Sequence, residues 1–181
     1  MAARLAYLTP GQLAPEDRDL LVRPVHLYRA MANAPGITRA FLELANQIRH
    51  RSVLDARLRE MAILVVAWET RSAYEWSHHV KIGRQFGLTD AEIRAAAGEG
   101  VAALAAADQA VLAAARAIAA RGDLDDDAVA ALRAHLDEAS LTELMLVCSL
   151  YVGLARFLKV ARIEVEEDYL PELREFPLPP A

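Results

Sequence analysis

A chain of 181 residues is long enough for one domain with a substantial core and short for two, so we expect a single domain over residues 1–181. The net charge of −5 and the lack of a long basic block argue against nucleic acid as a partner, because binding to a phosphate backbone needs clustered Lys and Arg. The longest uninterrupted apolar stretch, residues 61–68, is far shorter than a membrane span, and the first residues lack the apolar segment of a signal peptide. We therefore expect a cytoplasmic protein that does not insert into membranes.

The apolar fraction of 55% exceeds the usual range for a soluble domain, while aromatic residues make up only 6%. Much of the apolar content is alanine, which favours closely packed helices. In a small domain such an excess also suggests that further copies of the chain cover part of the surface. The alternative is an alanine-rich sequence without any such contact.

Cys148 is the only cysteine, so the chain cannot form an intrachain disulfide or perform chemistry that needs two sulfurs in one subunit. It lies in the apolar stretch Leu146-Val147-Cys148-Ser149-Leu150 of a predicted helix. We expect its side chain to be buried and to pack as a small hydrophobic group.

The first part of the chain predicts an extended leader followed by four helices. The leader, residues 1–13, contains a turn at Thr9-Pro10-Gly11. Helices are predicted over residues 15–22, 25–32, 37–49 and 55–70, with Pro15 and Pro24 at the first two starts and Asp55 as the cap of the last. Residues 62–68 are apolar on every side, which fits a buried helix or a central strand, and the preceding Leu58-Arg59-Glu60-Met61 favours the helix.

The rest of the chain predicts further helices and no convincing strand. Helices are predicted over residues 72–86, from residue 90, and over residues 108–121 and 125–136, with glycine stops and a capping box at Thr89-Asp90-Ala91-Glu92. A second capping box, Ser140-Leu141-Thr142-Glu143, predicts a long helix that reaches at least residue 163. The proline-rich tail, residues 171–181, is expected to be an extended arm that lies on a neighbour or is disordered. The fold class is therefore all-α, with eight or nine helices.

The stretch from Glu69 to Arg84 holds most of the polar and titratable residues that could carry chemistry. Glu75 and His79 are four residues apart, which places them on one face of a helix within reach of each other. A carboxylate beside an imidazole orients it and raises its pKa, so the pair is a candidate acid–base unit. Tyr74 and His78 form a second pair with the same spacing, rotated by about 100°.

The same spacing has a purely structural interpretation, because such pairs commonly add only a few tenths of a kcal/mol of helix stability. We expect no metal, since the adjacent histidines His78 and His79 point about 100° apart on a helix and the other histidines show no ligand spacing. The sequence also has no phosphate-binding loop, nucleophile elbow or dinucleotide fingerprint.

Several segments in order resemble the carboxymuconolactone decarboxylase / AhpD-like family. They are Leu27-Tyr28-Arg29-Ala30, Asn33-Ala34-Pro35, Arg57-Leu58-Arg59-Glu60 with the apolar helix to Trp68, Tyr74-Glu75-Trp76 to His78-His79, Ile82-Gly83-Arg84, Gly87-Leu88-Thr89, and the late helix around Tyr151. The resemblance covers most of the chain. It implies an AhpD-like multi-helix bundle that forms an obligate homo-oligomer (a dimer, trimer or hexamer), with sites close to subunit contacts.

The peroxidase branch of this family carries Cys-x-x-Cys-x-x-x-His. When that pattern is anchored on His79, the two cysteine positions fall on Ser72 and Glu75, and the histidine between them is replaced by Tyr74. Glu60 matches a glutamate that this branch uses on the preceding helix. A hydroxyl and a carboxylate cannot cycle through a disulfide, so thiol peroxidase activity is disfavoured even though a family label names it.

The decarboxylase branch carries Glu-x-x-x-His at the same place and works without a metal or organic cofactor on an acidic lactone. The resemblance therefore implies His79 as general acid–base, Glu75 as its partner or the proton donor, and Glu60 and Tyr74 as further members of the catalytic group. Substrate contacts are expected from Arg71, Ser72, Trp76 and His78, with Arg71, Lys81 or Arg84 holding a carboxylate. The N-terminal helices are more typical of uncharacterised members than of the compact decarboxylase.

The leading hypothesis is a cofactor-free lyase or isomerase that acts on a small organic acid or lactone. The main alternative is a non-catalytic scaffold or binding member of the family, in which Glu75 and His79 only support the fold.

Overall fold

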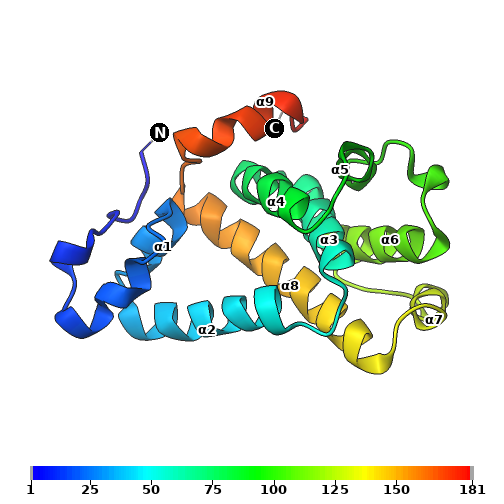
Figure 1. The fold of residues 1–181 in the computed structure, drawn as a ribbon, viewed down its shortest axis with the longest axis horizontal. Helices are drawn as coiled ribbons and strands as arrows, with labels where there is room; N and C mark the ends of the chain where they lie inside the picture. Colours follow the sequence, from blue (N-terminus) through cyan, green and yellow to red (C-terminus); the bar gives the residue numbers. More distant parts are fainter. Residues whose placement is uncertain (1, 180–181) are drawn as a thin grey trace.

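The computed structural model describes residues 2–179, which form nine α-helices and four short 3₁₀-helices and contain no strand (Figure 1). The α-helices are α1 (His26–Met31), α2 (Pro35–Arg51), α3 (Ala56–Glu69), α4 (Ala73–Gln85), α5 (Asp90–Ala96), α6 (Ala106–Arg121), α7 (Asp126–Arg133), α8 (Glu138–Ala161) and α9 (Leu170–Glu175). The 3₁₀-helices are Pro10–Gln12, Pro15–Leu21, Val101–Ala103 and Glu167–Tyr169. The predicted all-α fold is confirmed.

Helix α3 is the centre of the fold and packs against α4, α5, α6 and α8. Its start is capped by Asp55, whose side chain accepts a hydrogen bond from the backbone N–H of Leu58 at 3.0 Å. Residues 58–67 are all buried, so the apolar stretch is a buried helix and not a strand. Two charged side chains, Arg59 and Glu60, lie within this buried face and are only 2% and 1% exposed. Charged groups at such positions need partners, and they point toward the site described below.

Helix α4 is capped by Ser72 at its start, and Gly87, two residues after its end, has a φ of +90°. Only glycine adopts this backbone conformation without strain, so the predicted stop is confirmed. The chain then turns back, and the backbone N–H of Leu88 donates to the carbonyl of Gly83 at 2.9 Å. Leu88 packs so closely on Gly83 that a Cβ there would lie 2.5 Å from Leu88 Cδ1.

The predicted start and end of the long helix α8 are wrong. Its cap is Asp137, which accepts from the backbone N–H of Ser140 at 2.7 Å, so Ser140 lies inside the first turn. The carboxylate of Glu143, expected to complete a capping box, instead accepts from the loop before α3: the Ser52 hydroxyl and the backbone N–H groups of residues 53 and 54. The helix ends at Ala161, because Arg162 takes a left-handed φ of 55°.

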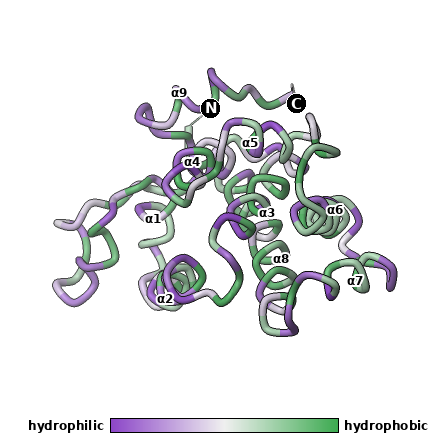
Figure 2. Tube along the Cα trace, turned by 45° about the vertical axis from the view of Figure 1, so that its right-hand side comes forward, coloured by the Kyte–Doolittle hydropathy of each residue, from purple (hydrophilic) through white to green (hydrophobic). Residues whose placement is uncertain are grey.

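Helix α8 is the one helix among residues 2–179 whose length and composition would allow a membrane span. In the folded chain, 33% of its most apolar 18-residue stretch is buried. Its hydrophobic colouring is clear in Figure 2. One side packs on α3 and α6 through side chains such as Leu144, Val147 and Cys148, which are at most 1% exposed. A core helix of a folded domain has these properties too.

The tail is more ordered than the sequence predicts. Residues 171–175 of the predicted tail belong to α9, which follows the 3₁₀-helix Glu167–Tyr169 and packs on α4. Pro171 fits because it occupies the first turn of α9, where no backbone N–H is needed. Trp76 anchors this segment by donating from Nε1 to the carbonyl of Phe176 at 2.8 Å. The last two residues of the predicted arm, 180 and 181, lie outside the described residues.

The leader, of which residues 2–13 are described, runs along the start of α1 and the end of α8, and the predicted turn at residues 9–11 is present as a 3₁₀-helix. The backbone N–H of Arg4 donates to the carbonyl of Ala161 at 2.8 Å, and the Tyr7 hydroxyl accepts from the backbone N–H of Glu164 at 3.0 Å. These contacts tie the N-terminal segment to the segment that follows α8.

Candidate active site

A cavity of about 50 Å³ lies between α2, α3, α4 and α8, with the segment before α1 closing one side. It is large enough for one or two water molecules or a small organic group. The polar residues that line it include Arg49, Glu60, Glu75, His78, His79 and Tyr151. Four of these were sequence candidates, and the structure brings them to one place.

The imidazole of His79 is held by Glu60 and not by Glu75. Its Nδ1 lies 2.7 Å from Glu60 Oε2, while Glu60 Oε1 accepts from Arg59 Nη2 at 3.0 Å. Burial alone would raise the pKa of Glu60, but His79 and Arg59 outweigh it and hold the pKa below its ordinary value. An ionised Glu60 on Nδ1 selects the tautomer of His79 that carries its proton there and leaves Nε2 as the free basic nitrogen.

The predicted contact between Glu75 and His79 is therefore not formed. Glu75 is 2% exposed, and neither of its carboxyl oxygens has a hydrogen-bond partner within residues 2–179. Burial raises the pKa of this carboxyl well above its ordinary value, which the nearby Ser72 hydroxyl offsets only in part. The spacing of four residues predicted that Glu75 and His79 share one face of α4. Glu60, on the neighbouring helix α3, instead forms the hydrogen bond with His79.

Tyr151, on α8, closes the cavity beside these groups. Its ring meets the His79 ring edge-on, with the centroids 5.0 Å apart, and its hydroxyl has no hydrogen bond within the described residues. Burial raises the pKa of Tyr151, and the ionised Glu60 raises it further, so the hydroxyl stays protonated. A role for Tyr151 could not be assigned from the sequence, because nothing local to α8 reveals that this side chain faces Glu60.

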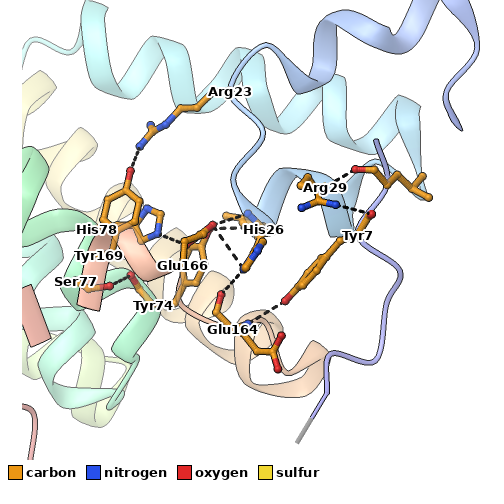
Figure 3. Close-up of polar contacts among 12 residues, drawn as sticks. Tyr7, Arg23, His26, Arg29, Tyr74, Ser77, His78, Glu164, Glu166 and Tyr169 are labelled. Carbon is orange, nitrogen blue, oxygen red and sulfur yellow. Dashed lines mark hydrogen bonds and ion pairs between the residues drawn. The ribbon is translucent and has the colours of Figure 1, made fainter. Parts of the chain in front are cut away.

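His78 also belongs to a second polar cluster, formed with the segment after α8 (Figure 3). Its Nε2 lies 2.8 Å from Glu166 Oε2, and its ring is stacked between those of Tyr74 and Tyr169. The Tyr74 hydroxyl donates to Glu166 Oε1 at 3.0 Å and accepts from the backbone N–H of Leu27 at 3.2 Å. Because both hydrogen-bonding capacities of this hydroxyl are used within the fold, Tyr74 shapes the wall of the cavity but offers no free group to a ligand.

Glu166 is a polar residue of the site that sequence reasoning missed. Burial would raise its pKa, but hydrogen bonds from His78 and from the backbone N–H of His26 lower it to about 2. It is 88 residues from His78 in the chain and lies within the acidic run Glu164-Val165-Glu166-Glu167-Asp168, which reads as a solvated surface segment. No local signal distinguishes Glu166, the one partly buried glutamate in that run.

Two arginines that line the cavity have no carboxylate partner within residues 2–179. Arg23 donates to the Tyr169 hydroxyl at 3.1 Å, and Arg49, on α2, makes no hydrogen bond or ion pair in that part of the chain. Both also line an adjoining cavity of about 210 Å³ next to Tyr28 and His50. Partly buried guanidinium groups without counterions are an unusual feature in a chain with a net charge of −5.

Three predicted substrate contacts lie elsewhere. Arg71 and Ser72 line a separate cavity of about 330 Å³ at the start of α4, on the far side of Tyr74. Trp76 is 1% exposed and packs against Trp68 in the main core. The geometric reason is the helical rotation of about 100° per residue, which turns residues next to Glu75 toward different surroundings.

Lys81 and Arg84, the other expected anion-binding cations, also lie away from the cavity. Lys81 lies over the Tyr169 ring at 4.7 Å. Arg84 pairs on the surface with Glu175 and Asp90, at 2.6 and 2.8 Å.

The positions of the peroxidase cysteines are occupied as the sequence indicated. Ser72 caps α4, and Glu75 lines the cavity. Cys148 lies in the main core, 0% exposed as predicted, and burial raises the pKa of its thiol to about 12. Among residues 2–179, no group of three or more His, Cys, Asp or Glu side chains is arranged to hold a metal ion.

Comparisons with known proteins agree with this architecture. Residues 35–120 match the model of the Carboxymuconolactone decarboxylase family. No curated protein matches the chain. A solved structure of a variant of the debrominase Bmp8, in complex with 2,3,4-tribromopyrrole, is similar with a TM-score of 0.80 and 20% identity over 97% of this chain and 98% of that one.

Two further solved structures have the same fold. An uncharacterized peroxidase-related protein from Ralstonia eutropha JMP134, described as an alkylhydroperoxidase AhpD core, has a TM-score of 0.79 and 16% identity over 93% of this chain and 95% of that one. A peroxidase-related protein from Silicibacter sp. TM1040 has a TM-score of 0.76 and 18% identity over 92% of this chain and 93% of that one. Residues 35–120 are thus similar in sequence to the carboxymuconolactone decarboxylase family, and the chain shares the AhpD-like fold over nearly its whole length.

Proposed function

We propose that this protein is a cofactor-free lyase or isomerase that acts on a small organic acid or lactone, with Glu75 as general acid and His79 as general base. The observation that carries this proposal is the buried carboxyl of Glu75, whose two oxygens have no partner within residues 2–179 and which faces the same cavity as His79. An unsatisfied buried carboxyl costs stability, and such groups are retained where they act on a ligand.

The two glutamates beside the cavity have pKa values shifted in opposite directions. Burial keeps Glu75 protonated, while His79 and Arg59 keep Glu60 ionised. A neutral carboxylic acid near an imidazole that is oriented by a carboxylate supplies both a proton donor and a proton acceptor at neutral pH. Glu60 would act as a positioning residue, since it reaches the reaction only through His79.

The chemistry follows from these protonation states. In an isomerisation, His79 Nε2 takes a proton from carbon and the Glu75 carboxyl delivers a proton to another atom of the substrate. In a decarboxylation, the C–COO⁻ bond breaks, CO₂ leaves with the electron pair remaining on carbon, and Glu75 protonates that carbon. The Tyr151 hydroxyl, kept neutral by burial and by the ionised Glu60, can donate a hydrogen bond to the developing negative charge.

The substrate class is indicated by Arg23 and Arg49. Both guanidinium groups line the cavity without a carboxylate partner in the described chain, so a carboxylate on the ligand would complete them. They replace Arg71, Lys81 and Arg84 in the role expected from the sequence. A small acid or an acidic lactone has the charge that these two residues would bind.

The test uses carboxylated γ-lactones and the related open-chain acids as probes, followed by ¹H NMR in D₂O for loss of CO₂, bond migration and deuterium incorporation. We expect wild-type turnover, and a loss of at least a hundredfold in His79→Ala and in Glu75→Gln with the oligomer intact. The matched controls are His135→Ala and Glu43→Gln, which change exposed residues away from the cavity. Turnover retained in both site variants would reject these roles.

A non-catalytic scaffold or binding protein is the main alternative. The observation in its favour is the buried chain of contacts from Arg59 through Glu60 to His79, which joins α3 to α4. On this hypothesis, replacement of Glu60 or His79 lowers the melting temperature and no probe is turned over by the wild-type protein.

Thiol peroxidase activity stays disfavoured, because the one thiol is buried and its pKa is about 12. An assay with an organic hydroperoxide and a dithiol reductant addresses it directly. If the Cys148→Ser variant still reduced the hydroperoxide, the conclusion that this site, with Glu75 in place of a cysteine, performs no peroxidase chemistry would be wrong.

A further inference from the structure

His78 and His79 are consecutive on α4, and each is held through one ring nitrogen by a carboxylate from a different part of the chain. Glu60, on α3, contacts His79 Nδ1 at 2.7 Å, and Glu166, after α8, contacts His78 Nε2 at 2.8 Å. Both imidazoles line the same cavity. The two carboxylates bond opposite nitrogens, so the nitrogen left over is Nε2 in His79 and Nδ1 in His78.

The ring of His78 is fixed in orientation. Tyr74 stacks on one side with the ring centroids 4.2 Å apart and the planes at 17°, and Tyr169 stacks on the other at 3.6 Å and 10°. Figure 3 shows Tyr74, Tyr169 and Glu166 gathered around this imidazole. A ring held on both faces and at Nε2 cannot turn over, so Nδ1 keeps one position. This nitrogen has no hydrogen bond within residues 2–179.

Glu166 is held as an anion by three donors. Its Oε1 accepts from the backbone N–H of His26 at 2.5 Å and from the Tyr74 hydroxyl at 3.0 Å, and its Oε2 faces His78 Nε2. An ionised carboxylate can only accept a hydrogen bond. Nε2 of His78 must therefore carry a proton and donate it in the hydrogen bond to Glu166. In the neutral imidazole Nδ1 is then a hydrogen-bond acceptor.

The surroundings also disfavour a charged imidazole. Burial lowers the pKa of His78, and although Glu166 raises it, His79 and Arg23 act in the same direction as burial. The other charged groups near the cluster are Lys81, over the outer Tyr169 ring, and His26, whose Nδ1 is 3.9 Å from Glu166. The neutral ring is thus the expected form at neutral pH.

We propose that His78 is a second ligand-binding imidazole of this cavity, with Glu166 as its positioning residue, and that its Nδ1 accepts a hydrogen bond from the ligand. The ligand class that this selects is a small acid that also carries a hydroxyl or N–H group, since Arg23 and Arg49 offer donors and His78 offers an acceptor. The inference rests on the proposed function only in taking this cavity as the ligand site.

A purely structural role for the cluster predicts something different. Glu166 would then serve to fasten residues 164–169 to α1 and α4, and Tyr74 and the backbone of His26 already satisfy one of its oxygens for that purpose. In that case the presence of an acceptor at Nδ1 of His78 would have no effect on the affinity of the cavity for a small acid.

The first measurement is the tautomer of His78 in the full-length protein, by long-range ¹H–¹⁵N correlation of ¹⁵N-histidine-labelled samples. We expect the Nε2–H form in the wild type and a mixture in Glu166→Gln, because the amide can donate to Nε2 as well as accept from it. A wild-type spectrum with the proton on Nδ1 would overturn the proposal, whether or not His79 and Glu75 support turnover.

The second measurement compares glycolate with acetate, which differ by one hydroxyl, in NMR titrations. We expect wild-type protein to bind glycolate roughly fivefold more tightly, the value of one net hydrogen bond. His78→Phe should keep the stacking with both tyrosines and lose this preference, while the control His26→Phe, which stacks on Tyr7 outside the cavity, should retain it. Equal affinity for the two acids, or no binding of either, contradicts the assignment of His78.

Discussion

At the scale of single residues, the site depends on two carboxyl groups in different surroundings. Glu60 is ionised because His79 and Arg59 stabilise its negative charge. Glu75 stays protonated because no group within residues 2–179 forms a hydrogen bond to its carboxyl oxygens. The sequence placed both residues in the candidate site but assigned Glu75 to the partner role that Glu60 fills. The choice between them depends on the distance between α3 and α4, which no spacing along one helix reveals.

Replacement of Glu75 by glutamine should raise stability at neutral and alkaline pH. Burial raises the pKa of Glu75 in the folded protein above its value in the unfolded chain. The contribution of this carboxyl to the free energy of unfolding is therefore fully present below the unfolded pKa and is lost as pH rises through the folded pKa. Over that range wild-type stability should fall by up to about 1.4 kcal/mol per pH unit, and Glu75→Gln should remove this slope. Melting temperatures from pH 5 to 9 measure it, with the exposed Glu43→Gln as control. Parallel profiles for the two variants would contradict a protonated Glu75.

At the scale of elements, the return of the chain after α4 positions the helix that carries both histidines. The turn needs Gly87 for its φ of +90° and Gly83 for the close approach of Leu88. A sequence pattern identifies Gly87 as a helix stop, whereas the need for glycine at position 83 arises only from the packing of Leu88.

Gly83→Ala should destabilise the protein by about 1–3 kcal/mol, because the added methyl group would lie 2.5 Å from Leu88 Cδ1 in a packed core. The matched control is Gly36→Ala in α2, where a Cβ meets nothing within 4 Å and helix propensity favours alanine. Urea denaturation of both variants measures the difference. A Gly83→Ala protein as stable as Gly36→Ala would show that Leu88 moves aside freely.

The segment after α8 should detach from the body of the protein in acid. The pKa of Glu166 is lowered to about 2, so its contribution is present above the unfolded value near 4.5 and is lost as pH falls from about 4.5 toward 2. With allowance for its partial exposure, this contribution is of order 1–2 kcal/mol. Hydrogen exchange of residues 164–176 should show lost protection below about pH 4, before the main core opens.

The same exchange experiment on Glu166→Gln should show reduced protection already at pH 6 and little further change in acid. The exposed neighbour Glu167→Gln should behave as wild type. If the tail stays protected in acid, other contacts such as that of Trp76 with Phe176 are sufficient to hold it.

At the scale of the whole molecule, one side of α8 is exposed along its length. After the first turn, exposed residues recur at a spacing of four and three, with Lys159 exposed beside them: Thr142, Leu146, Ser149, Gly153, Arg156 and Val160. Leu146 is 53% and Val160 63% exposed, and small residues between them would let another helix approach closely. We propose this face as a contact between copies in the homo-oligomer that the apolar composition suggests.

Leu146→Glu should therefore reduce the molecular mass measured by light scattering on a sizing column, because a buried charge at a contact between copies is costly. Val22→Glu is the matched control, since Val22 is 85% exposed and lies outside α8, at the end of the 3₁₀-helix Pro15–Leu21. An unchanged mass for Leu146→Glu would exclude this face from the interface.

The sequence by itself determined the helices, most of their ends, the burial of α3 and Cys148, and the resemblance to the carboxymuconolactone decarboxylase family, because periodicity, caps and glycine stops are local properties. Only the tertiary structure decided which carboxylate meets which histidine. Glu60 reaches His79 across 19 residues, and Glu166 reaches His78 across 88. Such pairings depend on how helices pack and on which groups lose water together, and neither is encoded in the spacing of residues along one helix.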